Sequence, residues 1–174
     1  MVNLKTQLKK KLKDAKKIAV LGIGSELRAD DVAGLLVAEG LKRIKNLKLK
    51  IFLGSTAPEN FTGEIIKFKP THIIIVDSID IDQKPGTILL IDTNEVDGVS
   101  FSTHKMPIKM MADYLFASLE CEIIIIGIQS KTLLFGEAVS EEVKKAVKNI
   151  IEIIREILQP EETKIDFNET NFIK

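Results

Sequence analysis

A pair of adjacent aspartates, a third aspartate and one histidine are the side chains whose types and spacing point most directly to chemistry. Asp30 and Asp31 are adjacent and follow one short apolar run, Asp77 follows another, and His104 lies in a later loop. Two carboxylates and one imidazole suit a divalent cation such as zinc, and three protein ligands leave one coordination position open for water or a substrate carbonyl. An acid at a strand end is also a common turn or helix-capping residue, so from spacing alone the metal site is a hypothesis.

The stretch from residue 17 to 40, KIAVLGIGSELRADDVAGLLVAEG, predicts a strand, a turn and a helix in succession. The run from Ile18 to Ile23 is typical of a buried strand, and Gly22 and Gly24 allow a sharp turn at its end. Ligand sites of open α/β sheets lie beyond the carboxyl ends of the strands, which is where the turn puts the adjacent aspartates. Because adjacent anions repel, we expect one of them to have a metal, Lys or Arg partner or to cap the helix.

Apolar runs and amphipathic segments alternate along the chain, which predicts a three-layer α/β/α fold. We expect a twisted, mostly parallel sheet of about five strands with helices on both faces. The remaining strands are predicted at residues 50–53, 72–76, 87–91 and 122–127. The strand at 87–91 is predicted as an antiparallel edge, because little chain separates it from the preceding strand. Helices are predicted from Pro58, from Pro107 and after Ser140, whose hydroxyl suits a helix N-cap.

At 174 residues the chain is long enough for one domain with its own core. Leu4, Leu8 and Leu12 recur at helical spacing near the start, which predicts a surface helix packed by its leucines. We therefore divide the chain into a basic helical extension at residues 1–16, a single α/β domain at 17–158 and a polar tail at 159–174.

The composition excludes several classes of protein. The chain has 25 basic and 25 acidic residues, so its net charge is zero and no basic excess suggests a nucleic-acid partner. No apolar segment approaches the roughly 18 residues of a membrane-spanning helix, and the N-terminus lacks the apolar core of a signal peptide. With Cys121 as the single cysteine, an intrachain disulfide and two-cysteine zinc motifs are excluded. We therefore expect a soluble cytoplasmic protein without membrane insertion.

Other catalytic or cofactor roles fit the sequence less well. The GIGS turn lacks the third glycine of the dinucleotide fingerprint, because Leu27 stands there, and no acid ends the second strand. A serine nucleophile needs a histidine base oriented by an acid, and one of the two histidines, His72, opens a buried strand. Cys121 stands beside Glu122 without a basic neighbour, which favours an inert buried thiol.

Several short blocks carry a more specific signal than any single residue. The chain reads GSELRADD at 24–31, GSTAPEN at 54–60, IIVD at 74–77, KPGT at 84–87, STHKMP at 102–107 and GIQ at 127–129. In this order the blocks resemble those of the hydrogenase maturation endopeptidases, which trim the large-subunit precursor of nickel–iron hydrogenases. Within that family the chain is most similar to the branch that processes the formate-hydrogenlyase type of hydrogenase. Two positions depart from the family pattern: Ser25 stands where Asn is usual, and Val32 where many members have Gly.

The resemblance implies a function and a set of site residues. A member of this family makes one cut near the C-terminus of the nickel-loaded precursor and releases a short extension. The family's metal ligands correspond to Asp31, Asp77 and His104 here, and the metal is then the nickel in the precursor or another divalent cation such as zinc. Asp30 becomes a candidate for supporting a ligand or accepting a proton, and helix capping stays open as its alternative.

The partner that the resemblance implies is the hydrogenase large-subunit precursor, and we expect the free protein to be a monomer. Two other functions stay open at this point. One is a chaperone that binds the hydrogenase subunit without cutting it, and the other is a small-ligand-binding α/β domain. Loss of a C-terminal fragment from the precursor distinguishes a protease from the first, and ligand-dependent thermal stabilisation identifies the second.

Overall fold

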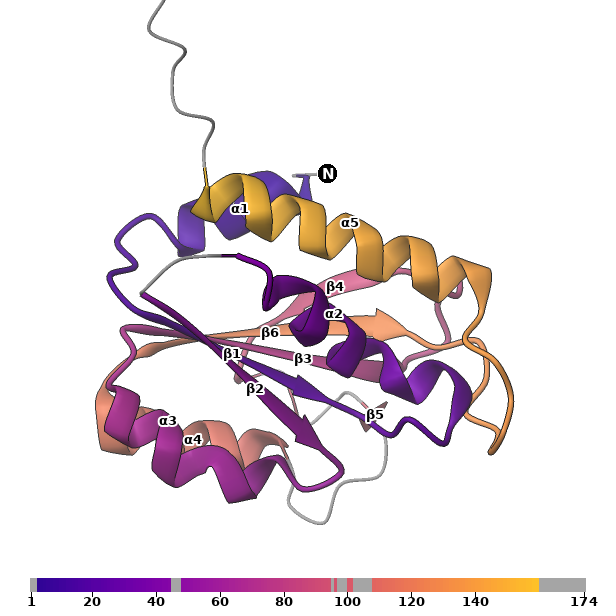
Figure 1. Cartoon of the computed structure of the whole chain (residues 1–174), viewed down its shortest axis with the longest axis horizontal. Coiled ribbons are helices and arrows are strands. Elements are labelled where there is room, and N and C mark those ends of the chain that lie inside the picture. The colour runs from indigo at the N-terminus through magenta and orange to yellow at the C-terminus, as the bar shows by residue number, and fades with distance from the viewer. Residues whose placement is uncertain (1–2, 45–47, 95, 97–99, 102–107, 160–174) are drawn as a thin grey trace, which may run out of the picture.

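A sheet with four parallel strands forms the centre of the molecule (Figure 1). In the computed structural model, which describes residues 3–44, 48–94, 96, 100–101 and 108–159, the strand order is β2-β1-β3-β6-β4. The parallel strands are β1 (Ile18–Ile23), β2 (Leu49–Ser55), β3 (His72–Asp80) and β6 (Glu122–Gln129). At the edge β4 (Ile88–Ile91) runs antiparallel to β6, and the short β5 (Ser100–Phe101) pairs antiparallel with the end of β3.

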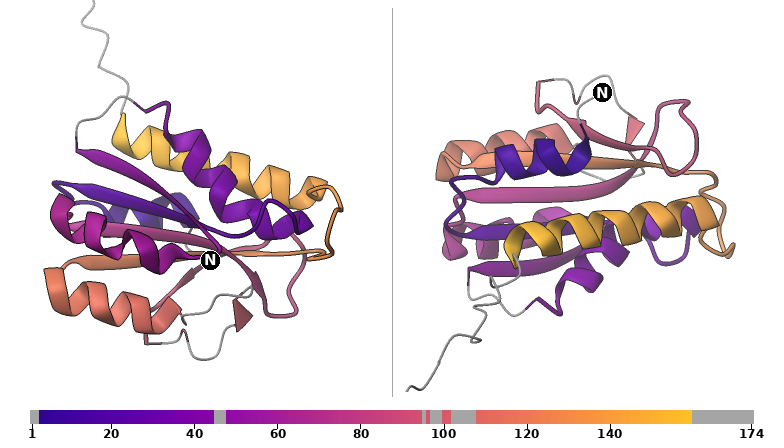
Figure 2. Two further views of the ribbon diagram at one scale, coloured as in Figure 1. Left: turned by 60° about the horizontal axis from the view of Figure 1, so that its bottom comes forward. Right: turned by 90° about the horizontal axis from the view of Figure 1, so that it is seen from above.

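Helices cover both faces of this sheet (Figure 1, Figure 2). One face carries α1 (Leu4–Lys11), α2 (Ala33–Leu41) and α5 (Glu141–Leu158), and the other carries α3 (Thr62–Phe68) and α4 (Ile108–Leu119). Two short 3-10 helices, η1 (Ala29–Val32) and η2 (Pro58–Phe61), lead into α2 and α3. None of the helices in the described part of the chain is long and apolar enough to span a membrane. The predicted three-layer α/β/α fold is confirmed, and so is the antiparallel edge strand.

Each face of the sheet has its own hydrophobic core. Val20, Ile74 and Val76 pack towards α1, α2 and α5, whereas Leu21 and Ile75 pack towards α3 and α4. Successive side chains of a strand point to opposite faces, so β1 and β3 must be apolar at nearly every position to fill both cores. For this reason their sequences are continuous apolar runs and do not alternate with polar residues.

The first and last helices pack against each other on the same core. Ser140 is the N-cap of α5, as predicted, and its hydroxyl accepts a hydrogen bond from the Val143 N–H at 3.4 Å. Leu8 and Leu12 are buried in the core that α5 covers, so the predicted leucine-packed helix is confirmed. The boundary at residue 16 stays a prediction, and residues 160–174 of the predicted tail lie outside the described residues.

The strand β3 is longer than its apolar run predicts. The run ends at Val76, but the strand continues to Asp80, because β6 pairs with it up to Ile79 and β5 pairs with its last two residues. Asp77 therefore lies inside β3, and the prediction that it follows the carboxyl end of this strand is wrong. On its other side β1 pairs with β3 only up to Val76, so β3 extends past this neighbour.

Candidate active site

The candidate site forms where the chain leaves neighbouring strands for opposite faces of the sheet. After β1 the chain enters η1 and α2 on one face, and after β3 it reaches α4 on the other. The edge of the sheet beyond β1 and β3 is therefore a switch point, the place at which open α/β sheets bind ligands. Because β3 extends past β1, Asp77 and Ser78 have no β1 partner, and η1 contacts β3 there.

Two glycines bring η1 against the sheet. At Gly24, whose φ is +138°, an added Cβ would lie 1.8 Å from the carbonyl oxygen of Asp31. At Gly34, in the first turn of α2, it would lie 2.1 Å from the carbonyl oxygen of Val76. A side chain at either position would push η1 away, so these glycines hold Asp31 close to the ends of β1 and β3. Gly22, predicted to help turn the chain, lies within β1 instead and admits the backbone of Gly34.

Ser78 joins two of the predicted metal ligands. Its hydroxyl donates to Oδ1 of Asp31 at 2.9 Å, and its backbone N–H donates to Oδ1 of Asp77 at 2.8 Å. Asp31 is 2% exposed and Asp77 is 0% exposed, so both carboxylates need partners within the protein. Ser78 is not among the predicted site residues. The signal that reveals it is strand alternation, because Ser78 follows Val76 by two positions and so turns towards α2 and η1.

Asp30 is also buried, but its carboxylate turns to a different part of the chain. It accepts hydrogen bonds from the N–H groups of Lys131 at 2.8 Å, Thr132 at 3.2 Å and Ser140 at 2.7 Å, and from the Ser140 hydroxyl at 2.9 Å. The carboxylate thus fastens η1 to the loop of residues 130–140 and to the N-terminal end of α5, where a negative charge is favourable. The alternative prediction, that Asp30 caps the helix it leads into, is wrong, since η1 and α2 have no side-chain cap. The role of Asp30 in supporting a metal ligand or accepting a proton stays a prediction.

The third predicted ligand, His104, lies outside the described residues. Within the residues that are described, no three His, Cys, Asp or Glu side chains are grouped so that they could hold a metal ion. Asp31 forms no ion pair with a Lys or Arg of that same part of the chain. The structure thus brings Asp31 and Asp77 to one serine, while the metal site stays a prediction.

Two other chemically interesting residues lie at the opposite end of the sheet. His72 is 8% exposed at the start of β3, where its Nδ1 lies 3.0 Å from Oγ1 of Thr71. Cys121 is buried just before β6. Burial raises the pKa of the Cys121 thiol above its ordinary value, and the carboxylate of Glu122 raises it further. The prediction that Cys121 is buried is confirmed, and a raised pKa agrees with the predicted inert thiol, which stays a prediction.

Comparison with known proteins identifies close relatives of this fold. A family model for the hydrogenase maturation protease HycI matches residues 35–157. A Methanocaldococcus jannaschii protein, provisionally named a hydrogenase maturation protease, is 40% identical over 88% of this chain and 98% of its own length. The hydrogenase 3 maturation protease of Escherichia coli is 31% identical over 75% of this chain and 84% of its own.

Solved structures agree with these sequence relatives. The crystal structure of the NiFe hydrogenase maturation protease HycI from Thermococcus kodakarensis has a TM-score of 0.82 and 32% identity to this chain. The match covers 88% of this chain and 99% of the Thermococcus chain. Sequence and fold therefore lead to one conclusion. The chain belongs to the hydrogenase maturation protease family.

Proposed function

We propose that this protein is an endopeptidase that makes one cut near the C-terminus of the large-subunit precursor of a nickel–iron hydrogenase. The cut follows nickel insertion and releases a short extension. Family membership supports the peptidase activity, and the names of two relatives support the substrate, since one is a hydrogenase 3 maturation protease and the other a NiFe hydrogenase maturation protease. The partner of this chain is then the large-subunit precursor.

The observation that carries this proposal is the pair of buried carboxylates at the switch point of the sheet. Asp31 comes from η1 and Asp77 from β3, and Ser78 donates a hydrogen bond to each of them. Burying two negative charges against one residue is unfavourable unless hydrogen-bond donors or a cation offset them. The fold alone does not need two buried carboxylates beside one serine, whereas a site that binds a cation and a peptide carbonyl does.

We assign Asp31, Asp77 and His104 as the residues that hold a divalent cation in the working complex. The donor set fits, since carboxylate oxygens and imidazole nitrogens suit nickel and zinc. When bound, such an ion polarises the scissile carbonyl and lowers the pKa of a bound water towards about 7. The ion is the nickel of the precursor, which is then part of the substrate, or a separate cation such as zinc.

The chain's own contribution is to hold the carboxylates in place before the precursor arrives. The Ser78 hydroxyl restrains Oδ1 of Asp31, and the Ser78 N–H restrains Oδ1 of Asp77. Gly24 and Gly34 fix the backbone that carries Asp31. Ordered side chains lose little entropy on binding, which favours a productive geometry.

Mass spectrometry of the nickel-loaded precursor tests the proposal. Incubation with the wild-type protein should release a C-terminal fragment, and His104→Ala should fail to release it while circular dichroism shows an unchanged fold. Complete processing by the His104→Ala variant would overturn the ligand assignment. Binding of the precursor by the wild-type protein without any fragment would identify a chaperone and overturn the protease proposal.

A further inference from the structure

Three large apolar side chains are exposed beside the candidate active site. Leu27 is 62% exposed, Leu134 62% and Phe135 75%. Leu27 lies in the loop between β1 and η1, and the other two lie in the loop between β6 and α5. Single exposed apolar residues are ordinary on protein surfaces, whereas a group on adjoining loops is typical of a contact surface. We call these three residues the apolar loop patch.

Hydrogen bonds hold the two loops of the patch together. The N–H of Gly136 donates to the carbonyl oxygen of Leu27 at 2.9 Å. The Nε of Arg28 donates to the carbonyl oxygen of Leu133 at 3.2 Å. The patch is therefore one preorganised surface and not two independent loop tips, and a preorganised surface loses less conformational entropy when it binds.

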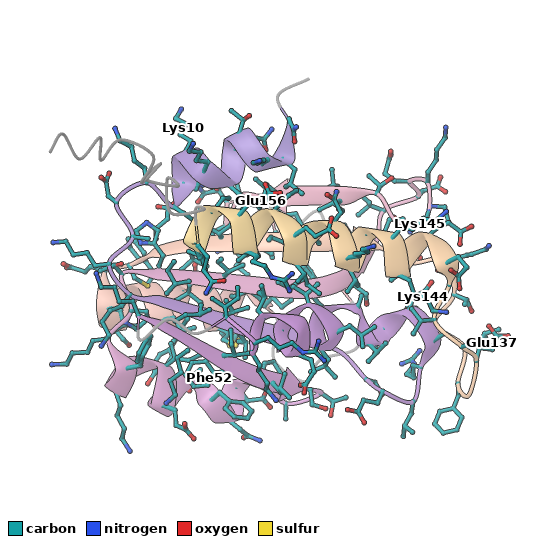
Figure 3. The ribbon with its side chains drawn as sticks, turned by 45° about the horizontal axis from the view of Figure 1, so that its top comes forward. Lys10, Phe52, Glu137, Lys144, Lys145 and Glu156 are labelled. Atoms are coloured by element: carbon teal, nitrogen blue, oxygen red, sulfur yellow. The ribbon has the colours of Figure 1, made fainter. Side chains whose placement is uncertain are left out.

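Two acidic residues, Glu26 and Glu137, flank the patch along the chain. Figure 3 shows Glu137 at the outer end of the second loop, beyond the N-terminal end of α5 that carries Lys144 and Lys145. Oε2 of Glu137 accepts a hydrogen bond from the hydroxyl of Thr132 at 3.1 Å, and Glu26 is exposed next to Leu27. An apolar centre with a charged rim is the usual anatomy of a surface that binds another polypeptide.

Asp30 fixes the patch relative to the candidate active site. Its carboxylate accepts four hydrogen bonds from Lys131, Thr132 and Ser140, which fasten the second loop to η1. The next residue in η1 is Asp31. The patch and Asp31 thus belong to one unit, in which the loop of Leu134 and Phe135 is hydrogen-bonded to η1 and Leu27 lies four residues before Asp31.

We propose that the apolar loop patch docks an apolar segment of the hydrogenase large-subunit precursor next to the site of cleavage. This inference rests on the proposed function. A protease that cuts one bond among many gains selectivity from contacts away from the reacting atoms. A docking contact that is equally strong in the enzyme–substrate complex and in the transition state lowers KM without raising kcat.

A matched pair of variants tests the docking surface in precursor processing. The double variant Leu134→Ser with Phe135→Ser should raise KM for the nickel-loaded precursor about tenfold and leave kcat unchanged. Phe116→Ser is the control, because this α4 residue is 58% exposed and lies at the other end of the sheet, beside Cys121 and Glu122. The control should change neither constant. All of these side chains are exposed, so both variants should keep the wild-type Tm.

A direct binding measurement separates this proposal from the protease proposal. With the nickel-loaded precursor immobilised, the double variant should bind about tenfold more weakly than the wild type. Wild-type binding without cleavage would overturn the protease proposal alone, and the comparison of binding constants would still test the patch. Equal KM and Kd for the double variant and the wild type, or equal weakening by Phe116→Ser, would overturn the docking surface. Self-association that the double variant abolishes would assign the patch to a second copy of the chain instead.

Discussion

The two ends of the sheet differ in the kind of charged group that they contain. At the carboxyl end Asp30, Asp31 and Asp77 are buried, and each accepts hydrogen bonds from the chain. At the amino end a cavity of about 650 Å³ lies between α1 and the starts of β3 and β6. The charged pair at this cavity, Lys11 and Glu122, has its nitrogen and oxygen 3.0 Å apart, and its side chains are 39% and 46% exposed.

Cavity volume is therefore a poor guide to the proposed active site of this fold. An ion pair open to water contributes little free energy and tolerates change. A buried carboxylate is unfavourable unless its surroundings are built to satisfy it, and Asp31 and Asp77 have such surroundings in Ser78. The buried acids are therefore the reason why we propose the active site at this end of the sheet, although the amino end has the cavity of about 650 Å³.

Asp31→Asn and Glu122→Gln test this contrast with the largest expected effect. Each replaces a carboxylate by an amide of similar shape, one at each end of the sheet. Asp31→Asn should lower kcat/KM for precursor processing by about 100-fold or more, because it removes the negative charge that we propose as a cation ligand. Glu122→Gln should leave kcat/KM within about twofold of the wild type. Equal losses would show that the two ends are not functionally distinct.

The carboxyl end was largely predictable where it depends on local sequence. The apolar run of β1 and the N-cap Ser140 define their elements, and the order of the sequence blocks selects Asp31 and Asp77, which both contact Ser78. The end of β3 was not predictable, because it depends on pairing with β6 and β5 and not on the residues of β3 itself. The hydrogen-bond partners of Asp30 were not predictable either, since they lie 101 to 110 residues further along the chain.

The buried bonds of Asp30 predict a loss of stability. Asp30→Asn should lower the free energy of unfolding by about 3 kcal/mol. In the wild type both carboxylate oxygens accept hydrogen bonds from N–H groups, whereas in the variant the amide NH2 is a donor and cannot accept them. Urea denaturation measures the change. Glu141→Gln is the control, since Glu141 is exposed in the first turn of α5, and it should cost less than about 0.5 kcal/mol. A loss for Asp30→Asn as small as the control's would show that the four bonds do not fasten the loop.

Ser78→Ala should have a smaller effect and one specific to the site. The variant loses the hydroxyl that restrains Asp31 and keeps the N–H that restrains Asp77. Zinc affinity, measured by calorimetry, and kcat for processing should each fall about tenfold. Ser130→Ala is the matched control, because this buried serine at the same end of the sheet donates to the carbonyl oxygen of Ile79 at 3.2 Å. Equal zinc affinity in the Ser78→Ala variant and the wild type would contradict a positioning role for Ser78.

The smallest effect belongs to an exposed ion pair at this same carboxyl end. Nζ of Lys131 lies 2.9 Å from Oε1 of Glu142, and this hydrogen bond lowers the pKa of Glu142 below its ordinary value. A lowered pKa means that the pair adds stability at neutral pH, and that this contribution is lost as the pH falls through the folded-state pKa. Lys131→Met should raise the pKa of Glu142 towards its ordinary value in an NMR titration, because the largest cause of the lowering is removed.

The Tm of the Lys131→Met variant should stay close to that of the wild type at neutral pH. The two side chains are 53% and 43% exposed, so water screens the pair, and the backbone N–H of residue 131 keeps its bond to Asp30. Differential scanning calorimetry measures this change. A large fall in Tm would mean that exposed charges stabilise the carboxyl end as strongly as the buried acids do. The contrast between the two ends would then lie in their geometry and not in burial.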